Sequence, residues 1–277
     1  MTASPSAAHS TPRIVVFTDL DDTLFQSRRK VPVELAATAR VVSPSQRANE
    51  SLMTTAQSAW FDWLSTALVV PVTARSGASF DRVTLGFSGP AVLAMGAVVR
   101  RAPGIVDGVW CERMRSELVG FQSALVEARD AALDAARRGA IALRAWIVEE
   151  SGVGGAYLCV KTDRPEDADR LEEIGSIVEA ALGPEAAHWR THRNGVNFAA
   201  LPPPVSKAAA VRHLMEAMRR DGRIVALGLG DSATDLEFMR LCDFWATPTG
   251  AQIDALVART GHRAAPEDPV RKKGIRS

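Results

Sequence analysis

The sequence lacks the features that would assign it to nucleic acid, to a membrane or to an oxidising compartment. Its 33 Lys and Arg residues nearly balance its 32 Asp and Glu residues, and a net charge of +1 gives no reason to expect nucleic-acid binding. No apolar run is long enough to span a bilayer. The three cysteines, Cys111, Cys159 and Cys242, are odd in number and widely spaced without a zinc pattern, which predicts a reducing, cytoplasmic location.

The first dozen residues lack both the charged start and the apolar stretch of a signal peptide. They are rich in Ala, Ser, Thr and Pro, so we expect a disordered leader over residues 1–12. The whole chain has 277 residues, of which 47% are hydrophobic. That is enough for two compact domains, or one large one, with a sizeable core.

The most informative segment is an apolar run, residues 14–17, that leads into the carboxylates of Asp19, Asp21 and Asp22. Such runs are typical of strands buried on both faces in parallel α/β sheets, where ligands bind beyond the carboxyl ends of the strands. Three acids there repel one another unless a cation lies between them. A hard oxygen-binding ion such as Mg2+, together with a phosphate, meets that need. The pattern indicates phosphoryl transfer, although a strand followed by an acidic turn is the plainer interpretation.

A second apolar run, residues 223–229, also leads to a carboxylate, Asp231, and Asp235 follows four residues later. The apolar residues at 236, 239 and 241 roughly fit one face of a helix that begins near Asp235. Two buried strands that both end in acids could lie side by side and share one metal ion.

Two further segments lie between these runs. Residues 68–72 form a third apolar strand that leads to Thr73 and Arg75, where a hydroxyl can bond a phosphoryl oxygen; a turn capped by Ser76 is the alternative. Lys207 stands in the first turn of a helix with apolar residues at 211, 214, 215 and 218, where the helix dipole disfavours a cation. This placement suggests a nearby anion, with a solvated surface lysine as the alternative.

In this order the four segments resemble the motifs of the haloacid dehalogenase superfamily of phosphohydrolases. Residues 19–23, Asp-Leu-Asp-Asp-Thr, match the first motif, Thr73 the second, Lys207 the third, and residues 230–235, Gly-Asp-Ser-Ala-Thr-Asp, the fourth. Four motifs in the correct order are far more specific than any one of them. The sequence departs from the family at Ala74, Met95 and Thr234, which concerns the subfamily more than the reaction.

The segment between the second and third motifs has a pattern of its own. It predicts a long helix over 112–138, strands over 142–149 and 156–162, a helix over 165–182, and strands over 187–192 and 196–201. This order resembles the C2-type cap of the Cof-like branch, subfamily IIB, which includes sucrose-phosphate, trehalose-phosphate and mannosylphosphoglycerate phosphatases. The resemblance implies an α/β fold. A Rossmann-like core, a parallel sheet flanked by helices, spans residues 13–105 and 202–277, and an inserted α+β cap spans 106–201.

Three details of the core are also expected from the sequence. One strand over 91–99 completes the first half of the core, and Pro103-Gly104 forms a turn beyond it. Residues 30–59 correspond to the family's flap beside the first motif. The aromatic residues at 60, 61 and 63 lie on the helix that follows, and we expect them to be core residues rather than a platform for substrate.

The resemblance implies a catalytic role for each matched residue. Asp19 attacks phosphorus and forms an aspartyl-phosphate. Asp21 protonates the leaving group and then activates the water that hydrolyses the intermediate. Thr73 and Lys207 hold the phosphoryl oxygens on which charge develops.

The resemblance also implies a Mg2+ site and a substrate site. Asp19, Asp231 and the backbone carbonyl of Asp21 hold the metal ion, while Asp235, with Ser232, orients Lys207 or the metal ligands. Specificity for the rest of the substrate is expected to come from the cap sheet and from Arg75. The candidates on the cap are His192, Arg193, Asn194 and Asn197, with Lys161 as a further one.

The sequence is compatible with three functions. The first is a Mg2+-dependent phosphatase acting on a small phosphorylated metabolite such as a sugar phosphate, with no nucleic-acid or membrane partner. The second is a sugar phosphomutase of the phosphomannomutase type, which would need a cationic cluster for a second phosphate; Arg190 and Arg193 are the close candidates. The third is a non-enzymatic binding module, which the complete set of catalytic groups argues against.

Overall fold

The computed structural model describes residues 11–45 and 50–261. The leader expected over residues 1–12 lies almost wholly outside the described residues. A parallel sheet in the order β14-β13-β1-β5 forms the centre of the core. Its strands are β1 (Arg13–Thr18), β5 (Leu68–Pro71), β13 (Ile224–Leu229) and β14 (Phe244–Ala246). Phe17 is paired with Gly228 on one side and with Val70 on the other, so the three predicted apolar runs are neighbours and end at the same edge.

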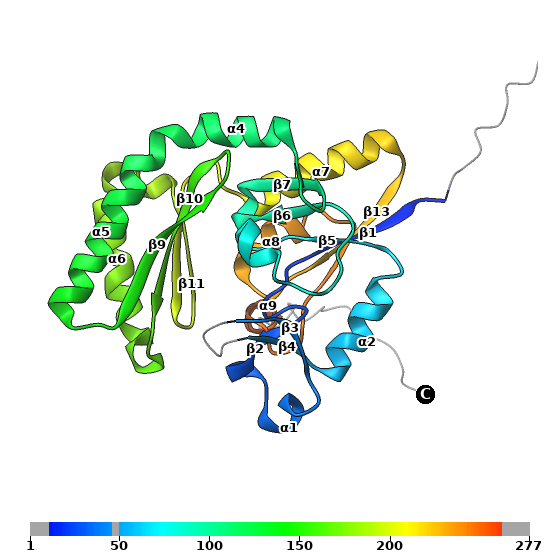
Figure 1. The fold of residues 1–277 in the computed structure, drawn as a ribbon, viewed down its shortest axis with the longest axis horizontal. Coiled ribbons are helices and arrows are strands. Elements are labelled where there is room, and N and C mark those ends of the chain that lie inside the picture. The colour runs from blue at the N-terminus through cyan, green and yellow to red at the C-terminus, as the bar shows by residue number, and fades with distance from the viewer. Residues whose placement is uncertain (1–10, 46–49, 262–277) are drawn as a thin grey trace, which may run out of the picture.

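Helices cover both faces of this sheet (Figure 1). Val15 and Phe17 pack with α7 (Lys207–Asp221) and α8 (Ala233–Met239) on one face. Val16 packs with α2 (Thr55–Leu64) on the other. Val15, Val16 and Phe17 therefore face opposite layers in turn and all are buried, which explains why these positions are apolar, while Ile14 is 55% exposed. The predicted α/β class with a parallel sheet flanked by helices is confirmed.

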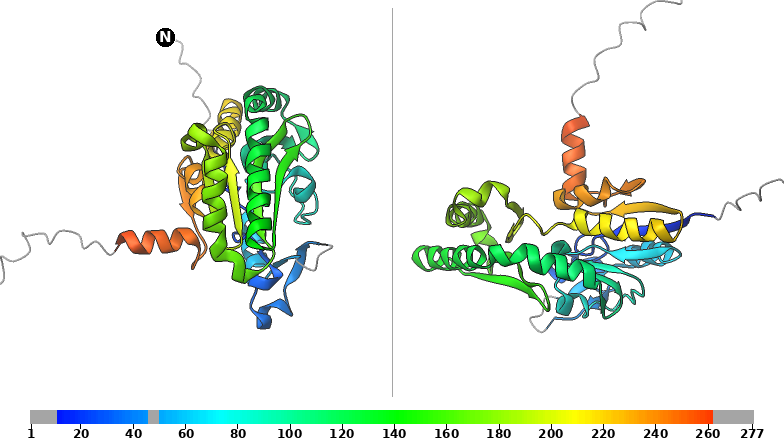
Figure 2. Two further views of the ribbon diagram at one scale, coloured as in Figure 1. Left: turned by 90° about the vertical axis from the view of Figure 1, so that its left-hand side faces the viewer. Right: turned by 90° about the horizontal axis from the view of Figure 1, so that it is seen from above.

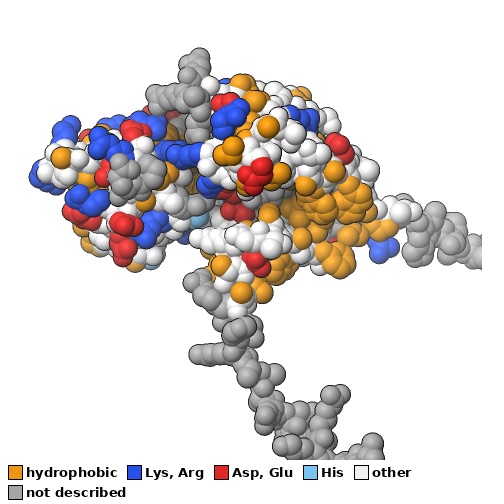
Figure 3. All heavy atoms as spheres, turned by 90° about the horizontal axis from the view of Figure 1, so that it is seen from below, with side chains coloured by type: hydrophobic (Ala, Val, Ile, Leu, Met, Phe, Trp, Pro, Cys, Tyr) orange, Lys and Arg blue, Asp and Glu red, His pale blue; other side chains and the backbone are white. Residues whose placement is uncertain are grey.

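Of the three aromatic residues of α2, only Phe61 belongs to the core. Trp60 and Trp63 are 42% and 60% exposed and stack on each other with ring centroids 5.0 Å apart. The expectation that all three are core residues was wrong, because α2 buries only the stripe that carries Phe61 and Leu64, and the tryptophans lie beside it. Seen from below, hydrophobic side chains gather on part of the core surface (Figure 3).

The strand expected over 91–99 is two strands, β6 (Ala91–Leu93) and β7 (Val98–Ala102). A short 3-10 turn separates them, in which Ala94 and Met95 have left-handed backbone (φ 49° and 58°). Gly96 ends the turn with φ 99°, and a Cβ there would lie 2.2 Å from the carbonyl oxygen of Ser206. The turn thus packs against the backbone that begins α7. The predicted turn at Pro103-Gly104 joins β7 to β8 (Ile105–Val106).

The flap, expected over residues 30–59, consists here of residues 26–45 and 50–53, which form a small sheet beside the carboxyl edge of the core (Figure 1). Residues 55–59 instead belong to α2. Its strands are β2 (Gln26–Ser27), β3 (Arg40–Ser43) and β4 (Ser51–Met53), in the order β2-β4-β3. Between β2 and β3 lie a 3-10 turn (Arg28–Lys30) and the short helix α1 (Val33–Ala36). A further short helix, α3 (Gly77–Phe80), follows β5.

The inserted cap is an antiparallel sheet in the order β11-β12-β10-β9, with helices on its outer face. Its strands are β9 (Leu143–Glu150), β10 (Gly154–Thr162), β11 (Arg190–Asn194) and β12 (Asn197–Leu201). Helices α5 (Gln122–Gly139) and α6 (Leu171–Ala181) run side by side over this sheet, and α4 (Gly108–Leu118) leads from the core into the cap (Figures 1 and 2). The other face of the sheet looks toward the core.

The predicted order of cap elements is present, but some boundaries differ. The long helix over 112–138 is two helices, α4 and α5, interrupted by a 3-10 turn at residues 119–121. Residues 165–170 and 183–188 also form 3-10 turns, so α6 and β11 begin later than expected. At the end of the described residues, α9 (Gln252–Gly261) projects from the core (Figure 2). None of the helices in the described part of the chain is both long and apolar enough to cross a membrane.

Candidate active site

Three carboxylates meet where β1 and β13 end. Asp19 follows β1 and Asp231 follows β13, while Asp235 lies in the first turn of α8. All three are buried, and one carboxylate oxygen from each lies within 4.8 Å of the others. We call this set the acid cluster. It forms because parallel strands bring their carboxyl ends to one edge, as the sequence predicted.

Lys207 is the cation that balances the acid cluster. Its Nζ donates to Oδ1 of Asp19 and to Oδ1 of Asp235, both at 2.7 Å. Burial alone would lower the pKa of Lys207, but the two carboxylates raise it above its ordinary value. The lysine is 7% exposed, so the alternative of a solvated surface lysine is excluded.

One lysine does not neutralise the cluster. Burial raises the pKa of Asp19 well above its ordinary value, and Lys207 only partly opposes this. Burial, with Asp235 and Asp22 nearby, raises the pKa of Asp231 to about 7. Oxygen donors that repel one another in a buried site fit a hard divalent cation. Asp19 and Asp231 could hold Mg2+.

Asp235 is held by the start of its own helix. Its Oδ2 accepts the backbone N–H of Ser232 at 3.0 Å and the hydroxyl of Ser232 at 2.7 Å. Its other oxygen accepts from Lys207. Both oxygens of Asp235 thus have protein partners, which suits the expected role of orienting Lys207. Gly230 makes room for this arrangement, since a Cβ there would lie 2.4 Å from the Cβ of Asp235.

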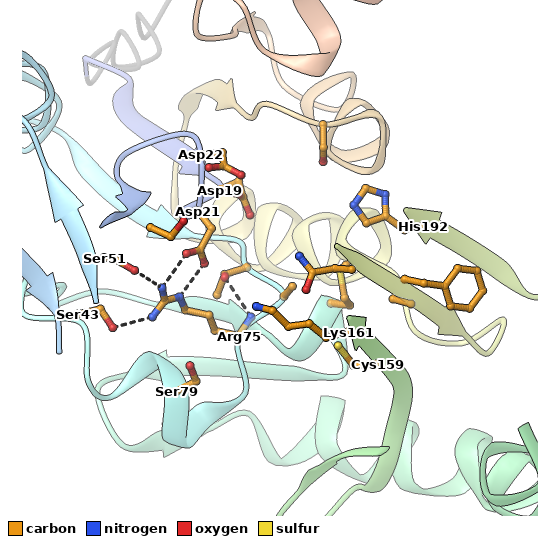
Figure 4. A pocket seen from close by; sticks show the side chains of 18 of the residues that line it. Asp19, Asp21, Asp22, Ser43, Ser51, Arg75, Ser79, Cys159, Lys161 and His192 are labelled. Atoms are coloured by element: carbon orange, nitrogen blue, oxygen red, sulfur yellow. Dashed lines mark hydrogen bonds and ion pairs between the residues drawn. The ribbon is translucent and has the colours of Figure 1, made fainter. Parts of the chain in front are cut away.

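Asp21 lies at the wall of the site and binds Arg75. The guanidinium donates to both carboxylate oxygens of Asp21 at 2.7 Å, in a bidentate pair. It also donates to the hydroxyls of Ser43 (2.8 Å) and Ser51 (3.0 Å) in the flap (Figure 4). Arg75 was expected to contact substrate, but its guanidinium is occupied by the carboxylate and the flap. The neighbouring Asp22 has left-handed backbone (φ 66°) and binds Lys30 of the flap at 2.5 Å.

Thr73 is buried where β5 ends, and it lines the site beside Asp19. Its Oγ1 accepts the N–H of Arg75 at 3.1 Å, which leaves the hydroxyl proton for another acceptor. The next carbonyl, of Ala74, accepts the hydroxyl of Tyr157 from the cap at 2.6 Å. Glu150 of the cap in turn accepts the N–H of Gly77 at 2.7 Å. These two bonds fix the cap to the loop that carries Thr73.

Core, flap and cap enclose a crevice of about 1020 Å³. Small-molecule sites usually measure roughly 300–1,000 Å³, so the space is large enough for a metabolite and not only for phosphate. The catalytic candidates Asp19, Asp21, Thr73 and Lys207 all line it, as do Asp231 and Ser232.

Side chains alternate between the two faces of the cap sheet along each strand, and this determines which residues face the crevice. On β10, Tyr157, Cys159 and Lys161 line the crevice, while Leu158 and Val160 pack against α5 and α6 in the cap core. The partners of the crevice residues across the sheet line it too: Arg144, Trp146, His192, Asn197 and Ala199.

Because of this alternation, the substrate candidates on the cap lie on different faces of the sheet. His192 and Asn197 line the crevice, and burial lowers the pKa of His192. Arg193 points to the opposite face of the sheet, where it pairs with Glu172 at 3.3 Å, so its expected substrate contact is not supported. The side chain of Asn194 lies outside the described part of the structure. Arg190 donates to the carbonyl oxygens of Pro203 and Val205 and forms no cluster with Arg193.

No family model matches the sequence, and no curated protein matches it. Solved structures do match. The C-terminal domain of trehalose-6-phosphate phosphatase from C. albicans aligns over 82% of this chain and 73% of that chain, at 15% identity and a TM-score of 0.53. A Thermoplasma acidophilum protein aligns over 90% and 89%, at 15% identity and 0.50. The sucrose-phosphatase from Synechocystis sp. PCC6803 aligns over 91% and 98%, at 14% identity and 0.48.

The chain has the fold of the haloacid dehalogenase phosphatases. A structural likeness at 15% identity establishes a common fold, and neither the substrate nor the residue roles of those proteins carry over to this chain.

Several site residues could not be found from the sequence. Ser43 and Ser51 reach Arg75 only because the flap folds over the core, and a serine in a polar loop carries no signal of that. Tyr157 could have been noticed, since it is the only tyrosine of the chain and lies in a predicted strand. A buried tyrosine usually has a partner for its hydroxyl. Its partner, a backbone carbonyl 83 positions away, is visible only in the structure.

Proposed function

We propose that the protein is a Mg2+-dependent phosphatase that hydrolyses a phosphate monoester of a sugar or a related small metabolite through an aspartyl-phosphate. The observation that carries the proposal is the acid cluster. A buried carboxylate, Asp19, is held by a buried lysine beside two further carboxylates, at one end of a crevice large enough for a metabolite. An ion pair that only stabilised the fold would need one carboxylate for the lysine, whereas this site has three.

In the proposed reaction, Asp19 attacks phosphorus through a carboxylate oxygen. An O–P bond forms to Asp19 as the ester P–O bond breaks, and Asp21, protonated on an oxygen that Arg75 has released, gives that proton to the leaving alkoxide. Asp21 then takes a proton from water, whose oxygen attacks phosphorus and releases phosphate and Asp19. A bound Mg2+ would supply charge neutralisation for the anionic substrate. Lys207 fixes Asp19 and, with Thr73, faces the phosphoryl oxygens.

Arg75 has a positioning role in this proposal. Its bidentate bond holds the Asp21 carboxylate in one orientation, and the two flap serines brace the guanidinium. The flap is thereby connected to the general acid and base. Positioning of this kind accounts for a large part of the rate advantage of enzymes.

We also propose a domain division, a location and a mode of substrate recognition. Residues 13–105 with 202–277 act as the core and 106–201 as the cap, consistent with a central parallel sheet in the first and a separate antiparallel sheet in the second. The location is the cytoplasm, in keeping with three free thiols. The physiological substrate is a phosphorylated metabolite recognised by cap residues.

A screen of phosphorylated metabolites for released phosphate tests the function. We expect phosphate from at least one sugar phosphate and from a small aryl phosphate, with Mg2+ present. Asp19→Asn should abolish both reactions while the protein stays folded, since an amide is neither a nucleophile nor an anionic ligand. Full activity of Asp19→Asn would show that the nucleophile is another residue. A complete lack of phosphate release would favour the binding module.

The phosphomutase is the alternative that the same site allows, because it uses the same aspartyl-phosphate. Arg190 and Arg193, the cations expected to form its second phosphate site, bind backbone carbonyls and Glu172 instead, although other cations line the crevice. A mutase must also exclude water from the intermediate. In the proposed phosphatase, water reaches the intermediate, so incubation with hexose monophosphates should yield free phosphate. Formation of an isomeric sugar phosphate, stimulated by a catalytic amount of sugar bisphosphate, would favour the mutase.

A further inference from the structure

The crevice face of the cap sheet carries a group of cations that the core chemistry does not use. Lys161 on β10 and Arg144 on β9 are directly opposite each other in the antiparallel register, and both line the crevice. Arg29 of the flap lines it as well. We call these three residues the basic group. Like charges directly opposite on neighbouring strands destabilise a sheet, so this arrangement costs stability in the free protein.

The protein supplies little negative charge to the basic group. Arg144 pairs with Asp163 at 2.8 Å, but within residues 11–45 and 50–261 neither Lys161 nor Arg29 has an ion pair. Burial lowers the pKa of Lys161, and Arg29 and Arg144 lower it further, while Cys159 and Asp163 oppose this only in part. Figure 4 shows Lys161 extending from its strand into the crevice.

The cations near the acid cluster, unlike Lys161 and Arg29, have carboxylate partners. Lys207 binds two carboxylates and Arg75 binds a carboxylate in a bidentate pair. Those cations are already balanced, whereas among residues 11–45 and 50–261 Lys161 and Arg29 have no ion pair, and Arg144 has a partly exposed pair with Asp163. A half-buried cation without a partner is the arrangement expected of a group that receives its counter-ion from a ligand.

We propose that the substrate carries a second anionic group, a carboxylate or a second phosphate, and that Lys161 with Arg144 and Arg29 binds it at the cap end of the crevice. This inference rests on the proposed function, because it assigns the reacting phosphate to the acid cluster and Lys207. Trp146, beside Arg144 on the same face and 38% exposed, has the Arg144 guanidinium over its ring, with Cζ 5.8 Å from the ring centroid, and its remaining surface can contact the carbon skeleton between the two anionic groups. The substrate class is therefore a phosphorylated sugar acid or a sugar bisphosphate.

Substrates that differ only at the far end test this proposal. Phosphate release is measured as kcat/KM for gluconate 6-phosphate and for sorbitol 6-phosphate, which share the phosphate and the chain length but differ in the terminal carboxylate. Glucose 1,6-bisphosphate with glucose 6-phosphate forms the second pair, with phosphate as the second anion. We expect the wild-type protein to prefer the anionic member of one pair by roughly tenfold or more, the factor that one charge-assisted hydrogen bond provides. The pair that shows the preference identifies the anion.

Three variants connect the preference to the basic group. Lys161→Met should reduce the preference roughly tenfold, and Lys161→Arg should retain most of it because the charge remains. Arg138→Met is the matched control; it removes one charge from an exposed cap residue on α5, and the preference should stay. Lys161→Met should also raise the unfolding temperature of the free protein, since it removes a desolvated charge beside two arginines. If Lys161 only stabilised the fold, Lys161→Met would lower the unfolding temperature instead.

The outcomes separate this inference from the proposed function. Phosphate release from the neutral-ended substrates with no preference for either anionic member would overturn the inference and leave the phosphatase standing. Equal loss of preference in Lys161→Met and Arg138→Met would overturn it too. If nothing is hydrolysed, the proposed function fails, and calorimetric binding of the same four compounds decides the inference alone. Binding of the anionic members no tighter than their neutral-ended partners would contradict it.

Discussion

Replacing Lys207 by Met removes the only cation that touches the acid cluster within the described residues. Its Nζ lies 2.7 Å from both Asp19 and Asp235, and the residue is 7% exposed. Breaking a buried ion pair by removing one partner costs about 3–5 kcal/mol. Because one amine serves two carboxylates here, we expect the upper part of that range for the metal-free protein at pH 8.

The cost should depend on pH with a definite sign. A carboxyl whose folded-state pKa exceeds its unfolded-state pKa destabilises the fold progressively as pH rises between the two values. Asp231 already has a pKa of about 7 against an ordinary 3.8, so that window runs from about pH 4 to pH 7. Without Lys207 the carboxyls should take up protons more readily, and the loss of stability should shrink at pH 5.

Urea unfolding in EDTA at pH 5 and pH 8 measures these losses. Lys30→Met is the control, since its pair with Asp22 is solvent-exposed and should contribute less than about 1 kcal/mol. Mg2+ should restore part of the lost stability at pH 8 if the acid cluster accepts a cation. Equal losses in the two variants, or a loss from Lys207→Met that grows as the pH falls, would refute the reasoning.

Three further predictions concern the metal ion, the general acid and the cap. EDTA should abolish phosphatase activity and Mg2+ should restore it, whereas Ca2+ should restore it poorly because it prefers looser, higher coordination; equal rescue by both ions in a phosphate-release assay would contradict the assignment. Arg75→Lys should lower kcat by on the order of 10²-fold with less effect on KM, since lysine cannot hold Asp21 in a bidentate pair; a change in KM alone would instead indicate a direct substrate contact. Tyr157→Phe should cost about 1–2 kcal/mol of unfolding free energy by leaving the Ala74 carbonyl unpaired, and an unchanged urea midpoint would show that the contact contributes nothing.

The core and its acid cluster could be predicted because the signals are local and the topology is simple. Apolar runs that end in Asp19, Thr73 and Asp231 identify buried parallel strands, and parallel strands bring their carboxyl ends to one edge. The contact between Lys207 and the carboxylates follows from the same reasoning, since a cation placed against a helix dipole needs an anion.

The cap surface and the flap could not be predicted to the same depth. The order of the cap elements follows from periodicity, but the face on which Arg193 lies depends on register, and a shift of one residue exchanges the two faces. The exposure of Trp60 and Trp63 could not be predicted either, because the apolar pattern of a helix does not show how much of its surface the neighbouring sheet covers. The bonds from Arg75 to Ser43 and Ser51 depend on long-range packing of a polar segment with no apolar period.

The most direct test of the central claim is to trap and locate the phosphoenzyme. In Asp21→Asn, an aryl phosphate should still phosphorylate Asp19, because the aryl leaving group needs little protonation, while hydrolysis of the intermediate is slowed. Acid quenching followed by peptide mass spectrometry should find one phosphoryl group, on the peptide that contains Asp19, and none in Asp19→Asn. A phosphoryl group on another residue, or wild-type phosphate release with no phosphoenzyme at any quench time, would contradict the account.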